Sequence, residues 1–164
     1  MTYSFRDYQP GDREACLAIF DAATPDWFAP FEREQFEAFL DNGPETYFVL
    51  VDANGAVAGS GGIEIEPSRR TAWLTWGMVD PARHGQGLGR LQLEHRLELL
   101  RGNGQVDRVC IDTSNKTAAF FERHGFVAQR IIPDGYAKGL HRHEMTLRFD
   151  HAAVKAATNG PGSQ

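Results

Sequence analysis

The pattern of hydrophobic and polar positions divides the first part of the chain into short elements. Residues 3–6 read as a strand, and a helix is expected over residues 10–23, where Asp12 is placed to act as the N-cap. After an aromatic segment at residues 24–31, a second helix is expected over residues 32–40. The chain is therefore expected to begin with one strand and two helices.

Further strands are expected in the middle of the chain. The pattern places them at residues 46–51, 56–66 and 71–79. The pair Asn54-Gly55 supplies hairpin turn chemistry between the first two of these strands. An antiparallel meander is therefore expected here.

The last part of the chain alternates helices with strands. A helix over residues 87–101 has only a narrow polar arc, so it is expected to be mostly buried. Ser114 can cap a short helix that runs to His124, with Gly125 as the C′ residue after it. The remaining strands are expected at residues 106–112, 126–132 and 142–149.

Length and composition indicate one domain. The chain has 164 residues, of which 41% are hydrophobic, so we expect a single domain over residues 1–150 and a largely disordered tail over residues 151–164. A net charge of −5 argues against nucleic acid as a partner. No segment resembles a signal peptide or a membrane span, so we expect no membrane partner and a cytoplasmic location.

The clearest functional signal lies at residues 76–90. There a strand is followed by a proline and then by Gly85, Gly87 and Gly89 at the start of a helix. Glycines let the backbone turn tightly and approach a ligand, and the first helical N–H groups have no partners within the helix. Such N–H groups bind anions, so we expect a phosphorylated cofactor at this loop.

The spacing of the glycines argues against two common phosphate-binding templates. The P-loop requires Gly-Lys followed by Ser or Thr, whereas this loop ends in Gly89-Arg90-Leu91. The dinucleotide fingerprint requires Gly-x-Gly-x-x-Gly in a βαβ unit, whereas the spacing here is Gly-x-Gly-x-Gly after an antiparallel meander. Neither a nucleoside triphosphate nor a dinucleotide is therefore indicated.

Two motifs together resemble those of the Gcn5-related N-acetyltransferase (GNAT) superfamily. Residues 84–89 resemble its pyrophosphate loop, and residues 113–115 with residues 120–126 resemble its C-terminal motif. The resemblance covers roughly residues 3–149. It implies an α/β (α+β) fold with about four helices and a mixed, mostly antiparallel sheet of six to seven strands, splayed at the fourth and fifth strands.

The resemblance also implies acetyl-coenzyme A (acetyl-CoA) as the cofactor. Its pyrophosphate would lie on the backbone N–H groups of the glycine loop, and its pantetheine arm would pair with the backbone of the preceding strand. A strand that splays from its neighbour leaves N–H and C=O groups unpaired, and an amide-bearing arm can satisfy them. The cofactor-binding residues implied are Met78, Val79, His84, Gly85, Gln86, Gly87, Leu88, Gly89, Arg90, Asn115 and Phe121.

Two positions depart from the family pattern. His84 stands where the family usually has Gln or Arg, which leaves the backbone cradle intact. Phe121 stands where many members have a tyrosine that protonates the departing thiolate, and phenylalanine has no proton to give. The pKa of a free thiol is about 8.5, so coenzyme A is a tolerable leaving group, and water, Ser114 or Tyr136 could supply the proton instead.

A base is needed to take a proton from an attacking amine. Glu64 and Glu66 share one face of a strand next to the thioester strand, and Glu64 is the better candidate because it lies further from the turn. The alternative is that both carboxylates are solvated, opposite a core face. The family implies that a backbone N–H near Val79 meets the oxyanion. The catalytic candidates are therefore Glu64, Ser114 and Tyr136.

Aromatic residues flank the expected acceptor side. Trp73 and Trp76 fall on opposite faces of their strand, so at most one of them can line the cleft. The aromatic residues at 27–31 could form a lid or simply cover the core, and residues 135–139 are expected to be a second flexible segment on the acceptor side.

The main hypothesis is an N-acetyltransferase that moves an acetyl group from acetyl-CoA to a primary amine by direct attack in a ternary complex, because no activated Cys or Ser motif is visible. The alternative is a catalytically weak acyl-CoA-binding sensor or regulatory domain, which Phe121 motivates. We expect a small amine or an amino acid as the acceptor, with a peptide or protein amine as the second option, and leave a homodimer open. No metal is expected, because His141 and His143 have no third ligand at suitable spacing.

Overall fold

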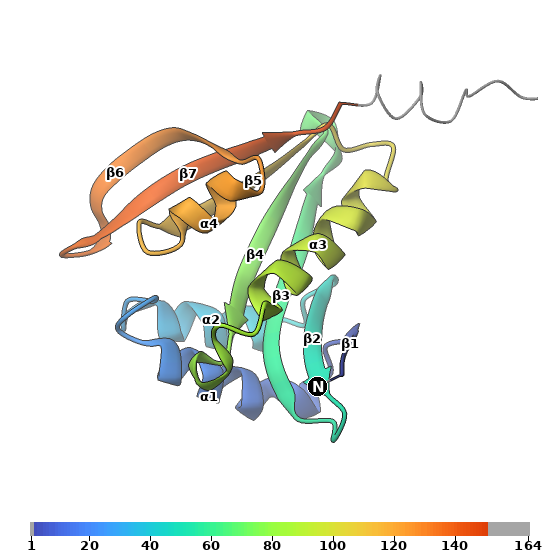
Figure 1. Cartoon of the computed structure of the whole chain (residues 1–164), viewed down its shortest axis with the longest axis vertical. Helices are drawn as coiled ribbons and strands as arrows, with labels where there is room; N and C mark the ends of the chain where they lie inside the picture. Colours follow the sequence, from blue (N-terminus) through green and yellow to red (C-terminus); the bar gives the residue numbers. More distant parts are fainter. Residues whose placement is uncertain (1, 151–164) are drawn as a thin grey trace, which may run out of the picture.

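The described part of the chain, residues 2–150, folds around one seven-stranded sheet in the computed structural model (Figure 1). The strand order is β1-β2-β3-β4-β5-β7-β6, and each neighbouring pair is antiparallel except β4 and β5, which run parallel. The predicted mixed, mostly antiparallel sheet is therefore confirmed. The strands are β1 (Tyr3–Asp7), β2 (Tyr47–Asp52), β3 (Val57–Glu66), β4 (Thr71–Val79), β5 (Arg108–Ser114), β6 (Val127–Ala137) and β7 (Leu140–Arg148).

Helices cover both faces of the sheet. The α-helices are α1 (Arg13–Ala23), α2 (Glu32–Asp41), α3 (Leu88–Arg101) and α4 (Ala118–Arg123), and single 3-10 turns occur at Pro10–Asp12, Pro67–Arg69 and Pro81–Arg83. The four predicted α-helices are all present. The tail expected at residues 151–164 lies outside the described residues.

The apolar stripe of each helix decides which face it covers. Leu93, Leu97 and Leu100 recur on one side of α3 and are buried against the sheet, together with Phe121 of α4. On the other side of the sheet, α1 and α2 pack around Phe20 and Phe36 in a separate hydrophobic cluster. The sheet is therefore buried on both faces where its central strands lie.

The sheet divides between β4 and β5. These two strands pair only over Thr71–Trp73 and Arg108–Cys110, after which they diverge (Figure 1). β5 continues in full register with β7, and β4 continues with β3. The edge of β4 from Leu74 to Val79 that would face β5 is consequently left without a strand partner, and the predicted splay is confirmed.

A bulge interrupts β4 where it leaves β5. Thr75 pairs with Gly62 and Met78 pairs with Ser60, so two residues of β4 lie opposite one residue of β3. Trp76 in this bulge has a φ of +41°, a conformation that costs a non-glycine residue free energy. The hydroxyl of Tyr47 donates a hydrogen bond of 2.8 Å to the carbonyl oxygen of Trp76 and helps to hold it there.

The bulge overturns the expected placement of the tryptophans. Leu74 packs on the α3 side of the sheet, so regular alternation would put Trp73 on the α1 and α2 side and Trp76 on the α3 side. Trp76 instead packs against Phe20 and Phe36 of α1 and α2. The left-handed residue reverses the alternation, so the prediction of opposite faces was wrong.

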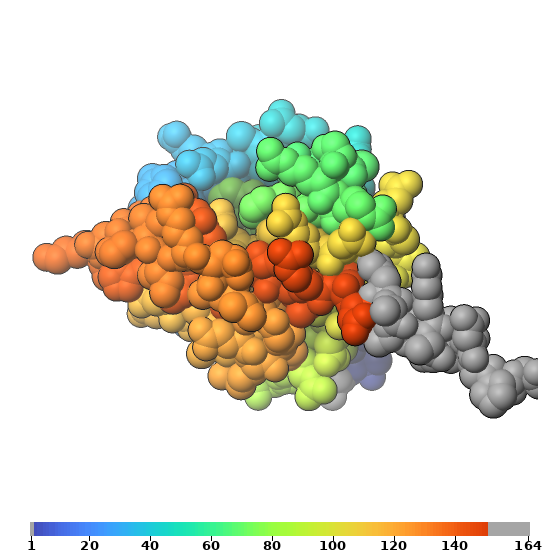
Figure 2. Space-filling view, turned by 90° about the horizontal axis from the view of Figure 1, so that it is seen from above, coloured from blue at the N-terminus to red at the C-terminus, as the bar shows by residue number. Residues whose placement is uncertain are grey.

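The hairpin of β6 and β7 projects from the body of the molecule (Figure 2). The prediction of a flexible segment at residues 135–139 was wrong in part. β6 continues to Ala137, and the turn is confined to the next two residues. Gly135 allows this extension, since a Cβ there would lie 2.7 Å from the Cβ of Arg142 on β7. Tyr136 is thereby held in a strand.

Candidate active site

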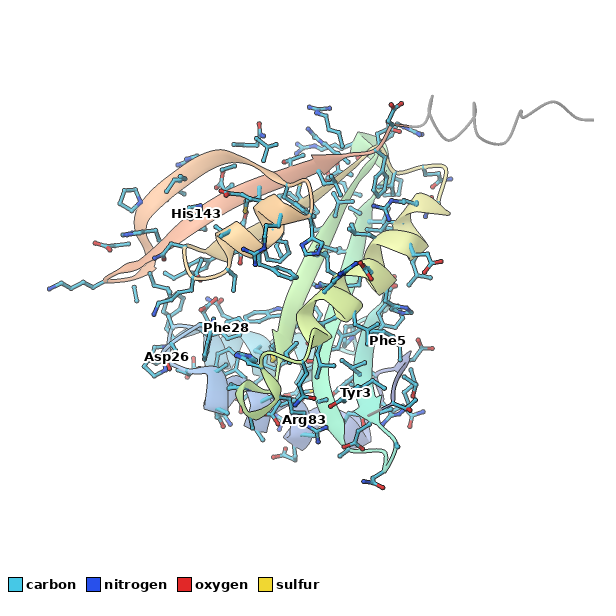
Figure 3. All side chains as sticks on the ribbon, viewed as in Figure 1. Tyr3, Phe5, Asp26, Phe28, Arg83 and His143 are labelled. Carbon is cyan, nitrogen blue, oxygen red and sulfur yellow. The ribbon has the colours of Figure 1, made fainter. Side chains whose placement is uncertain are left out.

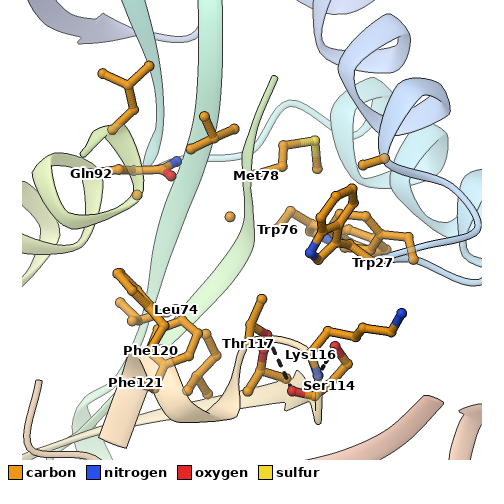
Figure 4. Close-up of a pocket in the computed structure, with 18 of the residues that line it drawn as sticks. Trp27, Leu74, Trp76, Met78, Gln92, Ser114, Lys116, Thr117, Phe120 and Phe121 are labelled. Atoms are coloured by element: carbon orange, nitrogen blue, oxygen red, sulfur yellow. Dashed lines mark hydrogen bonds between the residues drawn. The ribbon is translucent and has the colours of Figure 1, made fainter. Parts of the chain in front are cut away.

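A cavity of about 780 Å³ occupies the gap between β4 and β5. It passes from the start of α3 on one face of the sheet to α1 and α2 on the other, and its wall includes residues of both. Figure 4 shows Trp27 and Trp76 together on one side and Leu74, Phe120 and Phe121 on the other. The splay of the sheet therefore creates one continuous cavity with two chemically different ends.

The end at α3 is built as an anion site. Gly85 and Gly87 have φ values of +81° and +78°, which only glycine adopts at low cost, and a Cβ on either would point into open space. Gly87 is the N-cap of α3 and has no side chain to satisfy the N–H groups of the first turn. These N–H groups and the positive end of the helix dipole are free to bind an anion.

Side chains from β1 and β2 hold the loop before α3. Arg83 donates to Asp52 Oδ2 at 2.9 Å and to the hydroxyl of Tyr3 at 3.3 Å. Figure 3 shows Arg83 and Tyr3 close to each other beneath α3. The hydroxyl of Tyr3 in turn donates to Gln86 Oε1 at 3.0 Å. The loop is thus fixed before a ligand arrives, which lowers the entropy that binding must remove.

Several basic residues line the cavity despite the net charge of −5. Lys116 and Arg123 come from the segment around α4, and Arg83 and Arg90 from the segment around the loop. Arg83 and Arg90 are paired with carboxylates, whereas Lys116 and Arg123 form no ion pair within residues 2–150. A ligand with several phosphate charges would find a complementary field here.

The free edge of β4 offers backbone groups to an extended ligand. Asp80 N–H donates to Ala58 on β3 at 2.8 Å, and the direction of backbone groups alternates along a strand. The N–H and C=O of Val79 therefore point toward the gap. Nε2 of His84 lies 3.1 Å from the carbonyl oxygen of Val79 and donates to it when that nitrogen carries the proton.

The end of the cavity at α1 and α2 carries carboxylates. Glu32, at the start of α2, is buried, and Asp112, on β5, faces the cavity. Burial raises the pKa of Glu32, although the N–H of Ala29 donates to its carboxylate at 2.8 Å. Desolvation, then the nearby Glu144 carboxylate, raises the pKa of Asp112. Both groups are therefore stronger bases than an ordinary carboxylate.

The sequence and the fold both match known acetyltransferases. A model of the acetyltransferase (GNAT) family matches residues 16–126. The chain belongs to this family. No curated protein matches the sequence significantly. Acetyl-CoA, the cofactor expected from the sequence, is the cofactor of GNAT enzymes.

Solved structures with the GNAT fold superpose on most of this chain. One is the ribosomal-protein-S18-alanine N-acetyltransferase of Escherichia coli, with a TM-score of 0.73, 25% identity and coverage of 90% of this chain and 94% of that one. Ard1 of Thermoplasma volcanium gives a TM-score of 0.75 at 20% identity, and the alignment covers 92% of this chain and 99% of Ard1. A Salmonella typhimurium protein solved with its cofactor acetyl-CoA gives a TM-score of 0.70 at 19% identity. That alignment covers 100% of this chain and 99% of the Salmonella protein.

Most residues that the sequence suggested for cofactor binding in this GNAT chain lie on the cavity wall. The exceptions are Gln86, which is bonded to Tyr3 in a separate surface hollow, and Asn115. Asn115 Oδ1 accepts from the backbone N–H of His141 at 2.8 Å, so this side chain fixes the start of β7. The suggested residues on the wall are Met78, Val79, His84, Gly85, Gly87, Leu88, Gly89, Arg90 and Phe121.

The structure separates the three catalytic candidates. Ser114 and Tyr136 line the cavity, whereas Glu64 is exposed and does not. Glu64 pairs with Trp73 at the closed end of the splay, where β4 still pairs with β5. Glu64 is therefore not placed to act as the base, and its exposure fits the alternative of a solvated carboxylate.

Two acidic residues of the cavity were missed by the sequence reasoning. Asp112 precedes Ser114 by two positions on a strand, and this spacing could have shown that both share a face. Glu32 gave no comparable signal, because only the packing of α2 against the sheet brings it to the cavity. Phe121, as expected, places a ring without a hydroxyl on the wall.

The residues present fit acetyl-CoA. The open space above Gly85 and Gly87, the unpaired edge of β4 and the cations around the loop correspond to a pyrophosphate, an amide-bearing arm and further phosphate charge. Within residues 2–150 no group of three or more His, Cys, Asp or Glu side chains could hold a metal. No helix in this range is long and apolar enough to cross a membrane.

Proposed function

We propose that this chain is an N-acetyltransferase that moves an acetyl group from acetyl-CoA to a primary amine by direct attack in a ternary complex. The observation that carries the proposal is the single cavity that joins the glycine loop, the free edge of β4 and a carboxylate-lined end. Family membership supports the donor, and the two different ends support the two-substrate reaction.

The donor would be held mainly by backbone. The N–H groups at the start of α3 would bind the pyrophosphate, the N–H and C=O of Val79 would pair with a pantetheine amide, and Met78 on the cavity wall would contact the arm. Lys116 and Arg123, which have no carboxylate partner within residues 2–150, would meet the remaining phosphate charge. Acetyl-CoA supplies the activated acyl thioester at the other end of this arm.

Asp112 is proposed as the base. An alkyl ammonium must lose a proton before its nitrogen can form the C–N bond, and a carboxylate with a raised pKa accepts that proton more readily. Asp112 fits because it lies on β5 opposite the free edge of β4, and its carboxylate accepts no hydrogen bond from residues 2–150. Its role would be direct or through one water.

The other half of the reaction needs groups for the carbonyl oxygen and for the sulfur. The backbone N–H of Val79, beyond the Trp76 bulge, points into the gap and would stabilise the negative charge that develops on the carbonyl oxygen. As the C–S bond breaks, the thiolate would take a proton from Tyr136 or Ser114. Burial raises the pKa of Tyr136, so its hydroxyl keeps its proton at neutral pH.

The carboxylate-lined end favours a cationic amine as acceptor. Glu32 and Asp112 both lie within electrostatic reach of Tyr136, so they surround one part of the cavity. Trp27 and Phe28 cover this part and would enclose the apolar portion of an acceptor. A small amine or an amino acid is proposed first, and a peptide amine is the second option.

Two measurements on the same protein test the proposal. Acetyl-CoA at 100 times its Kd should raise the free energy of unfolding by about 2.7 kcal/mol. Free thiol should then appear when primary amines are added. Stabilisation without thiol release across a broad amine panel would favour an acyl-CoA sensor, and the absence of both effects would overturn the donor assignment as well.

A further inference from the structure

Arg96 is a buried cation without a counter-ion. Its residue is only 3% exposed, and one guanidinium nitrogen donates a long hydrogen bond of 3.4 Å to the carbonyl oxygen of Gly62. Its Nε has no hydrogen-bond partner, and no carboxylate within residues 2–150 forms an ion pair with it. Burial lowers the pKa of Arg96 to about 10, so the side chain is still cationic at neutral pH.

The neighbouring strands are built to make room for this guanidinium. A Cβ on Gly77 would lie 3.0 Å from a terminal nitrogen of Arg96, and a Cβ on Gly61 would lie 3.3 Å from its central carbon. Gln92, one turn earlier on α3, lies beside the guanidinium above Gly61 and donates to the carbonyl oxygen of Ser60. Glycines at both strand positions allow α3 to present two polar side chains where a helix usually presents apolar ones.

The position of Arg96 relates it to the acyl group rather than to the phosphates. Arg96 lies on the α3 side of the cavity, beside the bulge at Gly77. The phosphate loop precedes the first residue of α3, about two helical turns before Arg96. The cavity wall also includes the apolar side chains of Leu74, Ile111 and Phe121. A negative group here would find one strong partner in surroundings that exclude water.

A buried guanidinium without a partner is unfavourable, and an incoming anion would offset that cost. We propose that Arg96, assisted by Gln92, binds a carboxylate at the end of the acyl group, so that the protein accepts carboxyl-terminated acyl-CoA thioesters and prefers them to neutral acyl groups of equal length. Acetyl, which has no tail, is still a donor. This inference rests on the acyltransferase function proposed above.

The reaction is unchanged by the longer acyl group. The amine nitrogen forms a bond to the thioester carbonyl carbon, the C–S bond breaks, the amine proton goes to Asp112, and the thiolate takes up a proton. The tail carboxylate stays ionised on Arg96 and is transferred intact, so the product is an amide that carries a free carboxylate.

The first test uses the wild-type chain and needs no acceptor. Dissociation constants are measured by calorimetry for malonyl-CoA and butyryl-CoA, which are of similar length, and for succinyl-CoA and valeryl-CoA. We expect the carboxyl-terminated member of at least one pair to bind about tenfold more tightly, which corresponds to about 1.4 kcal/mol. Equal binding in both pairs, with acetyl-CoA still bound and turned over, would overturn this inference and leave the acetyltransferase function standing.

The second test uses variants of α3. Arg96→Leu should abolish the preference that the wild type shows for a carboxyl-terminated thioester, and Arg96→Lys should restore part of it. Arg101→Leu, on the same helix but exposed and outside the cavity, is the matched control and should retain it. If Arg96→Leu folds but weakens the binding of all acyl-CoA thioesters by the same factor, Arg96 does not recognise the tail carboxylate, and the inference fails. The wild-type comparison decides the question if the variant does not fold.

Discussion

Nε2 of His84 lies 3.1 Å from the carbonyl oxygen of Val79, on the strand edge where a pantetheine arm would bind. The imidazole ring also meets the indole of Trp27 edge to face, with centroids 4.8 Å apart. One histidine of the phosphate loop thus contacts both the donor strand and the aromatic segment between α1 and α2. In the free protein it satisfies a carbonyl that would otherwise lack a partner.

Coenzyme A should therefore displace His84 from Val79. Because an imidazole near an indole quenches its emission, we expect Trp27 fluorescence to rise as coenzyme A is titrated, with half of the rise reached at the Kd found by calorimetry. In Trp27→Phe the rise should disappear while Trp73 and Trp76 still emit. A titration that leaves the wild-type emission unchanged, although calorimetry shows binding, would contradict this displacement.

Replacement of the proposed base should separate catalysis from cofactor binding. Asp112→Asn removes the proton acceptor but keeps a side chain of similar size, so kcat should fall by about 100-fold or more while the Kd of acetyl-CoA stays nearly constant. Glu64→Gln is the matched control, because this exposed carboxylate lies outside the cavity, and its rate should equal that of the wild type. An unchanged rate in Asp112→Asn would remove Asp112 as the base.

The same residue predicts how activity and stability respond to pH. Desolvation and Glu144 raise the pKa of Asp112 above its usual range, so kcat/KM should decrease as the pH falls through that raised value and the base becomes protonated. Since the folded state holds this proton more tightly than the unfolded chain, ionised Asp112 destabilises the fold at neutral pH. Asp112→Asn should consequently raise the Tm at pH 7 and have less effect in acid. A lower Tm at pH 7 would contradict the assigned direction.

The glycine loop predicts a variant that impairs donor binding alone. Gly87 has a φ of +78°, so Gly87→Ala must either adopt a strained conformation or shift the N–H groups at the start of α3. We expect the Kd of coenzyme A to rise by roughly fivefold, because about 1 kcal/mol of backbone strain opposes the bound geometry. Gly104→Ala, in an exposed turn after α3 where a Cβ meets nothing, serves as the control. Equal affinities in the two variants would show that the loop geometry is not needed.

The donor half of the site could be predicted because it rests on local sequence. Gly85 and Gly87 are needed for a backbone turn, and that requirement is visible as spacing alone. The free edge of β4 arises because β5 diverges from it while β3 stays paired with it, and the family resemblance indicated this splay. Gln86 and Asn115 were placed by the same resemblance, but each was bonded elsewhere, to Tyr3 and to His141, by contacts between distant segments.

The acceptor half could not be predicted because it depends on tertiary geometry. Alternation put Glu64 and Glu66 on one face but could not give their distance from the splay, and Asp112 on β5 lies on the cavity instead. Alternation also failed at Trp76, where a single residue with positive φ turns its ring to the α1 and α2 side. Such a bulge leaves little trace in composition, since tryptophan rarely adopts this conformation.

Transfer of a labelled acetyl group is the decisive test of whether this chain acetylates a primary amine directly from acetyl-CoA. The wild-type chain is incubated with acetyl-CoA carrying ¹³C in the acetyl carbonyl, first alone and then with a panel of primary amines, and the label is followed by mass spectrometry. Direct transfer predicts that the label appears as an N-acetyl amide of at least one amine, in an amount equal to the thiol released. The protein incubated with acetyl-CoA alone should carry no label. Label found as a stable acyl-protein, or bound acetyl-CoA that transfers nothing to any amine, would contradict it.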